Sequence, residues 1–331
     1  PTAFALGKLD VYAKNINGTN VYIAMIPNKK FKNEQERIAE NCFLIFKKAL
    51  NIFEKNVGSQ YWVFVTPIAK NGKQITGPES FLSTFTPTYL GMNSQYGATN
   101  LYGIYAHHIF HRWNSWTRGP QYKNYPEKFN LGWFVEGPTV MFELVAMSNA
   151  GYREEVKHII QDTYDTYMYN YYETKNDIPL ANVKNYSKTF MIYRKSLLIS
   201  ILLSKEIYEQ SSGKSTIYDL LYNLFHEYGY YKDVISNQVI QKFAANLTTS
   251  NINKFFKTHI HGKAYFNIDW IYKDTDKDLL CDIYELLLET DLHDKDTDND
   301  GFADGVEVES GTNPTDKSSY PSTPSVEFPN S

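Results

Sequence analysis

Apolar residues recur at helical spacing along most of the chain beyond residue 33. Between residues 34 and 56, Ile38, Cys42, Phe46 and Phe53 fall on one side of an expected helix. The same spacing predicts further helices over residues 102–113, 133–148, 152–172, 187–210, 215–228, 235–246 and 251–260. The pattern therefore predicts a mainly helical body.

The first hundred residues follow a different pattern. Residues 9–26 read as two strands joined at Asn17-Gly18, a dipeptide that favours the tight turn of a hairpin. Residues 61–68 form a short apolar run typical of a buried strand. Residues 70–100 are rich in Gly, Asn, Ser and Thr, which predicts loops with short strands. We therefore expect an α+β chain in which a small N-terminal sheet precedes the helices.

Charge is distributed unevenly along the chain. The net charge is −4, but residues 270–316 carry 15 acids and 3 lysines, a local charge of −12 that leaves about +8 elsewhere. Carboxylates at that density repel one another unless cations neutralise them. The positive excess forms no basic run, which argues against nucleic-acid binding. No run of 18 apolar residues occurs, so we expect no membrane span.

The acidic segment after Trp270 contains two copies of one pattern. Calcium takes six to eight oxygen ligands, which a twelve-residue loop supplies from positions 1, 3, 5, 9 and 12 and from the backbone carbonyl of position 7. The first copy places Asp274, Asp276, Asp278, Leu280 (carbonyl), Asp282 and Glu285 at these positions; the second places Asp296, Asp298, Asp300, Phe302 (carbonyl), Asp304 and Glu307. The alternative is a solvated acidic linker, but the repeated offsets favour two calcium sites.

The two loops differ at position 6. Gly301 occupies it in the second loop, where the backbone turns sharply, whereas the first loop has Leu279 there. We therefore expect the second loop to be the better-formed site. The segment also resembles the thrombospondin type 3-like repeats of secreted bacterial and archaeal proteins, and residues 309–314 match the Gly-Thr-Asp/Asn-Pro ending of those repeats. This resemblance implies a secreted or cell-surface protein that uses calcium.

A histidine cluster forms a second candidate site. His107 and His111 are four residues apart on an expected helix, so both rings point to one face and provide half of a zinc site. Glu136, at the start of the next long helix, is the best candidate for the third ligand. Without further context, these histidines could equally be core residues.

Several motifs extend the pattern, in order along the chain. Residues 107–114 resemble the His-Glu-x-x-His-x-Trp-Asn signature of the glycyl aminopeptidase family of gluzincin metallopeptidases, followed by a Pro-ending stretch at 117–120. Residues 133–137 match its Trp-x-x-Glu-Gly motif, and residues 193–198, 218–229 and 255–262 resemble later segments. The resemblance covers about residues 85–262 and implies a gluzincin-type domain with a mixed N-terminal sheet and a helical C-terminal part. It also implies a zinc-bound centre in which the Tyr193 hydroxyl stabilises the oxyanion.

Three departures from that family bear on activity. His108 stands where the family has its general-base Glu, and losing such a base removes on the order of 10²–10⁴ in rate. Residues 89–94, which match the family's substrate strand, contain no Glu, and the calcium repeats replace a C-terminal peptide-binding module. Glu143 is expected to be structural. Two hypotheses follow: a catalytically degenerate binding or assembly protein, or an active zinc peptidase that uses His108 as its base.

We therefore expect a metallopeptidase-like domain over residues 1–270, a calcium-binding segment over 271–316 and a Ser/Pro-rich linker or disordered end over 317–331. The expected partners are a peptide or protein ligand, a second copy of the chain or a cell-surface protein. Cys42 and Cys281 could form a disulfide or remain buried thiols. A first residue other than Met would fit a removed signal segment, and sequons at Asn17, Asn185 and Asn246 weakly support secretion. The tyrosine-rich run at 164–172 is expected to pack on the surface of a helix.

Overall fold

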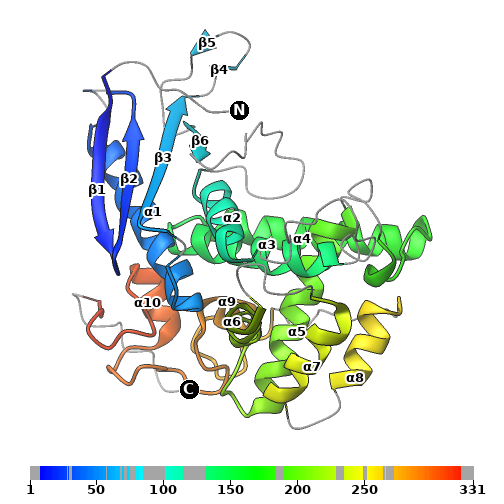
Figure 1. Ribbon diagram of the computed structural model, residues 1–331. Coiled ribbons are helices and arrows are strands. Elements are labelled where there is room, and N and C mark those ends of the chain that lie inside the picture. The colour runs from blue at the N-terminus through cyan, green and yellow to red at the C-terminus, as the bar shows by residue number, and fades with distance from the viewer. Residues whose placement is uncertain are drawn as a thin grey trace.

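The structure of the chain is a computed structural model, shown in Figure 1. It describes residues 8–27, 29, 32–56, 58–67, 69–70, 73–74, 80–84, 101–114, 131–183, 190–228, 235–248, 252–263, 265 and 272–321. The predicted segments at 89–94 and 117–120 and the sequon at Asn185 lie outside these residues.

A mixed sheet forms the N-terminal part. Strands β1 (Asp10–Ile16) and β2 (Thr19–Met25) form the predicted hairpin, in which Asn17 and Gly18 take positive φ angles of 45° and 89°. β3 (Gln60–Pro67) runs parallel to β2, and β6 (Ser80–Thr84) runs antiparallel to β3, giving the order β1-β2-β3-β6. A separate short pair is formed by β4 (Ala69–Lys70) and β5 (Lys73–Gln74).

One long helix, α1 (Lys32–Phe53), connects the parallel strands β2 and β3 and packs against the sheet. Its apolar stripe, including Cys42, Phe46 and Phe53, is fully buried with Val21 and Ile23 of β2. The amphipathic pattern at 34–56 therefore predicted both the helix and the face that it buries. The small mixed sheet and the helix over it are confirmed as part of an α+β fold.

The remainder of the chain is mainly helical (Figure 1). Its α-helices are α2 (Leu101–Asn114), α3 (Gly132–Asn149), α4 (Arg153–Met168), α5 (Ser196–Ser211), α6 (Ile217–Tyr228), α7 (Asn237–Leu247), α8 (Ile252–Phe255), α9 (Asp282–Leu288) and α10 (Asp304–Ser310). Short turns are η3 (Tyr169–Glu173), η4 (Leu180–Asn182), η6 (Phe190–Lys195) and η7 (Phe256–Ile260). Three of these, η3, η6 and η7, are π-helical and occupy the ends of segments predicted as plain α-helix.

Helix α3 lies at the centre of the helical part. Seventeen of its residues, from Gly132 to Ser148, are buried, and it packs against α2 and α5. Gly137 permits the close approach to α5, because a Cβ there would lie 2.4 Å from Ser200 Oγ and 2.5 Å from the Ser196 carbonyl oxygen. The glycine of the Trp-x-x-Glu-Gly motif therefore has a packing role beside the candidate zinc ligand.

The core continues across residue 270 into the acidic segment. Ile283, Leu286 and Leu287 of α9 are at most 1% exposed. Burying one such side chain stabilises a fold by about 1.5–3 kcal/mol relative to leaving it in water. Helix α9 contacts α3 and α5, so the first calcium loop is attached directly to the helical body. Residues 317 and 318, at the start of the expected linker, form a turn, and Lys317 Nζ donates to the Asn299 carbonyl of the second loop.

The two cysteines are free thiols in this structure. Cys42 is buried beneath the sheet, where burial raises the pKa of its thiol well above the usual value. Cys281 is partly exposed and precedes α9. The disulfide alternative is therefore not formed. Among the described helices, none has both the length and the hydrophobicity needed to cross a membrane.

Candidate metal centres

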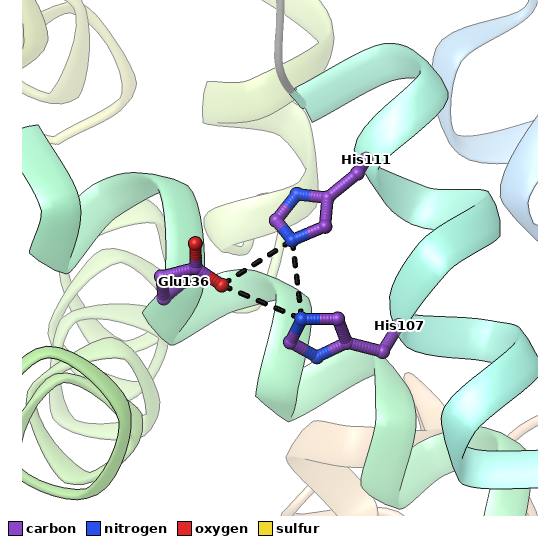
Figure 2. A group of neighbouring side chains, drawn as sticks. All are labelled: His107, His111 and Glu136. Carbon is purple, nitrogen blue, oxygen red and sulfur yellow. Dashed lines mark hydrogen bonds and ion pairs between the residues drawn. The ribbon is translucent and has the colours of Figure 1, made fainter. Parts of the chain in front are cut away.

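Helix α2 directs His107 and His111 toward Glu136 of α3 (Figure 2). The two Nε2 atoms are 3.1 Å apart, and Glu136 Oε2 lies 3.4 Å from His107 Nε2 and 3.2 Å from His111 Nε2. Zinc at its usual ligand distances of about 2.0–2.1 Å separates tetrahedral ligand atoms by about 3.3–3.4 Å. The three atoms therefore have the spacing of one face of a zinc tetrahedron, with the fourth vertex left for a small ligand.

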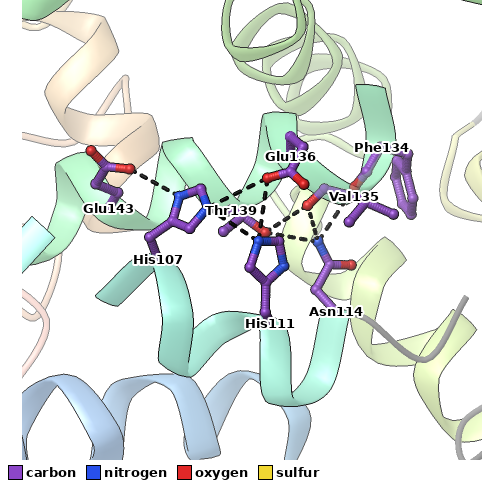
Figure 3. Close-up of polar contacts among 8 residues, drawn as sticks. All are labelled: His107, His111, Asn114, Phe134, Val135, Glu136, Thr139 and Glu143. Atoms are coloured by element: carbon purple, nitrogen blue, oxygen red, sulfur yellow. Dashed lines mark hydrogen bonds and ion pairs between the residues drawn. The ribbon is translucent and has the colours of Figure 1, made fainter. Parts of the chain in front are cut away.

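An asparagine at the end of α2 braces the turn that carries Glu136. Pro138 has no N–H, so the helix loses its hydrogen bond to the Phe134 carbonyl. Asn114 Nδ2 lies 3.4 Å from that carbonyl oxygen and 2.9 Å from the Val135 carbonyl oxygen, and it donates to both (Figure 3). The sequence marked Asn114 only as part of a motif, and Pro138 accounts for one of its two bonds to carbonyl oxygens of α3, the one to Phe134.

Glu143 supports His107 from the side away from the other ligands (Figure 3). Its Oε2 lies 3.1 Å from His107 Nδ1. Glu143 follows Glu136 on the same helix, α3. A carboxylate on this nitrogen keeps the proton there and leaves Nε2 as the metal-binding atom. The sequence predicted a structural role for Glu143, and the geometry specifies it as orienting the His107 ring.

The protonation of His107 and Glu136 depends on whether a metal ion is bound between them. Burial disfavours a charged His107, but contacts with Glu136 and Glu143 outweigh burial and raise the pKa of His107 to about 9 without metal. Burial disfavours the Glu136 carboxylate, but His111 and His107 reverse this and hold the pKa of Glu136 well below its usual value. A zinc ion would replace a proton at this cluster, so zinc binding and proton release are coupled.

The two residues with expected catalytic roles lie beside the cluster. The ring centroid of His108 is 5.2 Å from that of His107 and 6.3 Å from that of His111. The Tyr193 ring is half-buried, with its centroid 6.2 Å from that of His107. Tyr193 belongs to the π-helical turn η6, which ends in a buried ion pair of 2.7 Å between Lys195 Nζ and Asp177 Oδ1. The catalytic assignments of His108 and Tyr193 stay predictions.

The two acidic loops adopt the same conformation. Asp274, Asp276 and Asp278 converge in the first loop, and Asp296, Asp298 and Asp300 converge in the second. At position 6, Leu279 has a φ of 79° and Gly301 a φ of 101°. Their N–H groups donate to Asp274 Oδ2 at 3.0 Å and to Asp296 Oδ2 at 2.9 Å. Leucine therefore accepts the left-handed conformation, and the first loop is formed as well as the second.

Positions 9 and 12 of the loops have different surroundings. Glu285 and Glu307, at position 12, are 0% exposed, and their carboxylate oxygens have no hydrogen-bond partner among the described residues. A buried carboxylate without a partner is unfavourable unless a cation pairs with it. Asp282 and Asp304, at position 9, instead accept hydrogen bonds on both oxygens from Thr275 and Thr297. The residues fit calcium, and position 9 would contribute through water.

Comparisons with known proteins bear on the fold and on the second acidic loop. Residues 296–317 match the family model of the bacterial TSP3 repeat. A search of curated proteins finds no match. Among solved structures, the chain is similar to the aminopeptidase N family protein from Idiomarina loihiensis, with a TM-score of 0.57 and 18% sequence identity over 79% of this chain and 48% of that protein. The chain thus spans about half the length of that relative. It combines an aminopeptidase N-like fold with a bacterial TSP3 repeat near its C-terminus.

Proposed function

We propose that the chain is an extracellular zinc-binding protein in which an aminopeptidase N-like domain has lost hydrolytic activity and serves in binding or assembly at the cell surface. TSP3 repeats, which are typical of extracellular bacterial proteins, support that location. The expected ligand is a peptide or another protein. Calcium in the two acidic loops stabilises the chain, since the carboxylates there repel one another without it.

The observation that carries this proposal is the identity of residue 108. The carboxylates that contact the histidine cluster among the described residues are Glu136, which is positioned as a ligand, and Glu143, which contacts the far side of His107. Because Glu136 would bind the metal and Glu143 orients His107, neither carboxylate would accept a proton from a water at the fourth vertex. An imidazole beside a divalent cation is a poor substitute, because its protonated form is repelled by the ion.

The chain's own residues retain features suited to holding a ligand. Bound zinc would polarise a ligand oxygen as a Lewis acid. Tyr193 lies beside His107, and its hydroxyl would donate a hydrogen bond to the ligand oxygen that the zinc ion polarises. Peptide carbonyl or carboxylate groups provide such an oxygen.

The second candidate function is an active zinc peptidase with His108 as its base. Two observations support it: the three ligand atoms have the spacing of one face of a zinc tetrahedron, as three-ligand catalytic zinc sites do, and the ring centroid of Tyr193 lies 6.2 Å from that of His107. This hypothesis predicts peptide hydrolysis that a chelator abolishes.

Substitution of His108 separates the two functions. The zinc-loaded wild-type protein and the His108→Glu and His108→Gln variants would be assayed against a broad peptide library, with zinc content measured by elemental analysis. We expect zinc in all three proteins and hydrolysis only in His108→Glu, because Gln provides no base. Chelator-sensitive hydrolysis by the wild type would instead establish the peptidase, and absence of zinc from all three would contradict the metal site.

A further inference from the structure

The two calcium loops are followed by helices of equal length but very different burial. Every residue of α9, from Asp282 to Leu288, is buried. In α10 only Asp304, Glu307 and Val308 are buried, and the Glu309 side chain is 90% exposed. The loops are alike in conformation, so the difference lies in what their helices contact.

Helix α9 is inserted between elements of the helical body. Ile283, Tyr284 and Leu287 belong to the same hydrophobic core as α3 and α5. On another side of α9, Leu286 packs with Tyr208 of α5 and with Leu292. The Tyr208 hydroxyl also donates to Asp291, just beyond α9. On the N-terminal side of the loop, the Tyr272 hydroxyl donates to Gln161 Oε1 of α4 at 2.8 Å. The first repeat is therefore attached to the helical body before and after its loop.

Glu285 links the first calcium loop to the hydrophobic core around α9. It lies between Tyr284 and Leu286, is 0% exposed, and has no hydrogen-bond partner for either carboxylate oxygen among the described residues. Without calcium, this buried carboxyl has no hydrogen-bond partner among the described residues, which makes the burial of α9 less favourable. With calcium, the same carboxylate holds α9 to Asp274, Asp276 and Asp278 of the loop.

The contact continues to the zinc ligands. Helix α9 packs on α3, which carries Glu136 and Glu143, and α3 packs on α2, which carries His107. Helix α10 makes no comparable set of apolar contacts: of its residues, Val308 alone belongs to the main core among the described residues. The first loop can thus affect the histidine cluster through buried apolar packing of two helices. Outside the first repeat, α10 contacts the helical body through Val308 and through an ion pair of 3.6 Å between Glu309 Oε2 and Arg153 Nη1 of α4.

We propose that the first calcium loop is a structural part of the aminopeptidase N-like domain, and that calcium bound there, rather than in the second loop, controls the stability of the His107–His111–Glu136 centre. This inference rests on the proposed calcium and zinc sites. It makes the zinc centre dependent on the calcium concentration outside the cell.

Two matched variants test the proposal in the full chain. Glu285→Gln and Glu307→Gln remove the same charge from position 12 of each loop while keeping the side-chain size. Thermal unfolding would be followed by near-ultraviolet circular dichroism in calcium-free and calcium-containing buffer, and zinc retention by elemental analysis after dialysis. In the wild type we expect calcium to raise the Tm of the whole domain by roughly 5 °C or more, as expected for a ligand well above its Kd.

The variants should differ in their response to calcium. Glu285→Gln should lose most of that Tm shift and lose zinc on dialysis, although its Tm without calcium should equal or exceed that of the wild type, since the variant no longer buries a carboxyl group that has no partner. Glu307→Gln should keep most of the shift and retain zinc. Equal losses in both variants, or separate unfolding of the repeats and the helical body, would overturn the inference. Failure of the wild type to bind calcium in equilibrium dialysis would instead contradict the proposed calcium sites themselves.

Discussion

Asp278 of the first calcium loop accepts a hydrogen bond from the backbone N–H of Gly305, with 2.8 Å between Oδ2 and N. Gly305 is the second residue of α10, the helix that follows the second loop. A Cβ at this position would lie 2.3 Å from the Asp278 carbonyl oxygen, so only glycine permits this approach. One carboxylate therefore belongs to the first ion site and also caps the helix that carries Glu307.

Gly305→Ala should lower calcium affinity in both loops. The added methyl group must push α10 away from Asp278, and overpacking of this kind typically costs about 1–3 kcal/mol. A calcium titration by calorimetry should show weaker binding and loss of any coupling between the sites. Gly311→Ala is the control, because nothing lies within 4 Å of its Cβ and only its left-handed backbone, with a φ of 79°, is strained. If Gly305→Ala binds calcium as the wild type does, the two loops are independent.

Leu279→Gly should strengthen the first loop. Leu279 is 68% exposed and has a φ of 79°, so its side chain contributes little burial while its backbone is strained. Glycine relieves that strain, which is worth about 1–2 kcal/mol for a left-handed residue, although it gives back about 0.5–1 kcal/mol in chain entropy. We expect a small rise in calcium affinity of the first loop, measured with the second loop disabled by Glu307→Gln. A fall in affinity would show that the leucine side chain itself contributes.

The two acidic loops also show which structural features the spacing of carboxylates in the sequence can predict. The offsets of the carboxylates predicted two loops, and the positions of the aspartates confirm that they converge. The expectation that Leu279 would make the first loop poorer is wrong in geometry, because the hydrogen bonds to Asp274 Oδ2 and Asp296 Oδ2 are equivalent. The contact between Asp278 and Gly305 joins residues 27 positions apart, and spacing within one loop contains no information about it.

Glu143→Gln should weaken zinc binding at the histidine cluster. The glutamine amide carries no negative charge, so it cannot replace the Glu143 carboxylate that lies 3.1 Å from His107 Nδ1. Loss of such a supporting carboxylate typically lowers metal affinity 10–100-fold. Competition with a chromophoric chelator would measure the change. Glu154→Gln, on the exposed first turn of α4, serves as the control and should bind zinc as the wild type does.

Gly137→Ala should both destabilise the chain and disturb the zinc ligands. Its Cβ would lie 2.4 Å from Ser200 Oγ and 2.5 Å from the Ser196 carbonyl oxygen, so α3 must move away from α5 directly beside Glu136. We expect a loss of about 1–3 kcal/mol in urea unfolding together with weaker zinc binding. Gly132→Ala, in the same helix, would meet Ile192 at an ordinary 3.5 Å and should be tolerated. Equal effects of the two substitutions would show that the α3–α5 contact is not tight.

The grouping of His107, His111 and Glu136 was predictable from the sequence, but the residues that support this group were not. Spacing on one helix placed His107 and His111 together, and the resemblance to gluzincins suggested Glu136; the three atoms lie within 3.4 Å of one another. The Asn114 bonds to the Phe134 and Val135 carbonyls of α3 depend on the packing of two helices, which the spacing of the motif does not reveal. The π-helical form of η6, which carries Tyr193, likewise had no signal in the apolar pattern.

Without calcium, the chain should lose stability as pH rises. Burial, with the nearby charges of Asp276 and Asp278, raises the pKa of Glu285 to about 9, and burial raises the pKa of Glu307 to about 7. An unfolded Glu has a pKa of about 4.3, so the folded calcium-free chain holds protons that the unfolded chain releases. This stabilising contribution is complete below about pH 4.3 and is lost progressively as pH rises toward 9.

The measurement is the midpoint of urea unfolding at pH 6 and pH 8.5, in calcium-free buffer and with calcium. In calcium-free buffer the midpoint should fall with pH, because the folded chain holds protons on Glu285 and Glu307 that the unfolded chain releases. With calcium, the ion stabilises the charged carboxylates, so the gain from calcium should grow over the same interval and protons should be released on binding. In the zinc-loaded protein, Glu285→Gln should remove much of the fall in calcium-free buffer between pH 7 and 8.5, since Glu307, with a pKa of about 7, is at least half ionised throughout that interval. Zinc must be present, because the raised pKa of metal-free His107, about 9, would add a fall of its own over the same interval. A calcium-free midpoint that rises with pH would mean that these carboxylates are already ionised and paired in the folded chain.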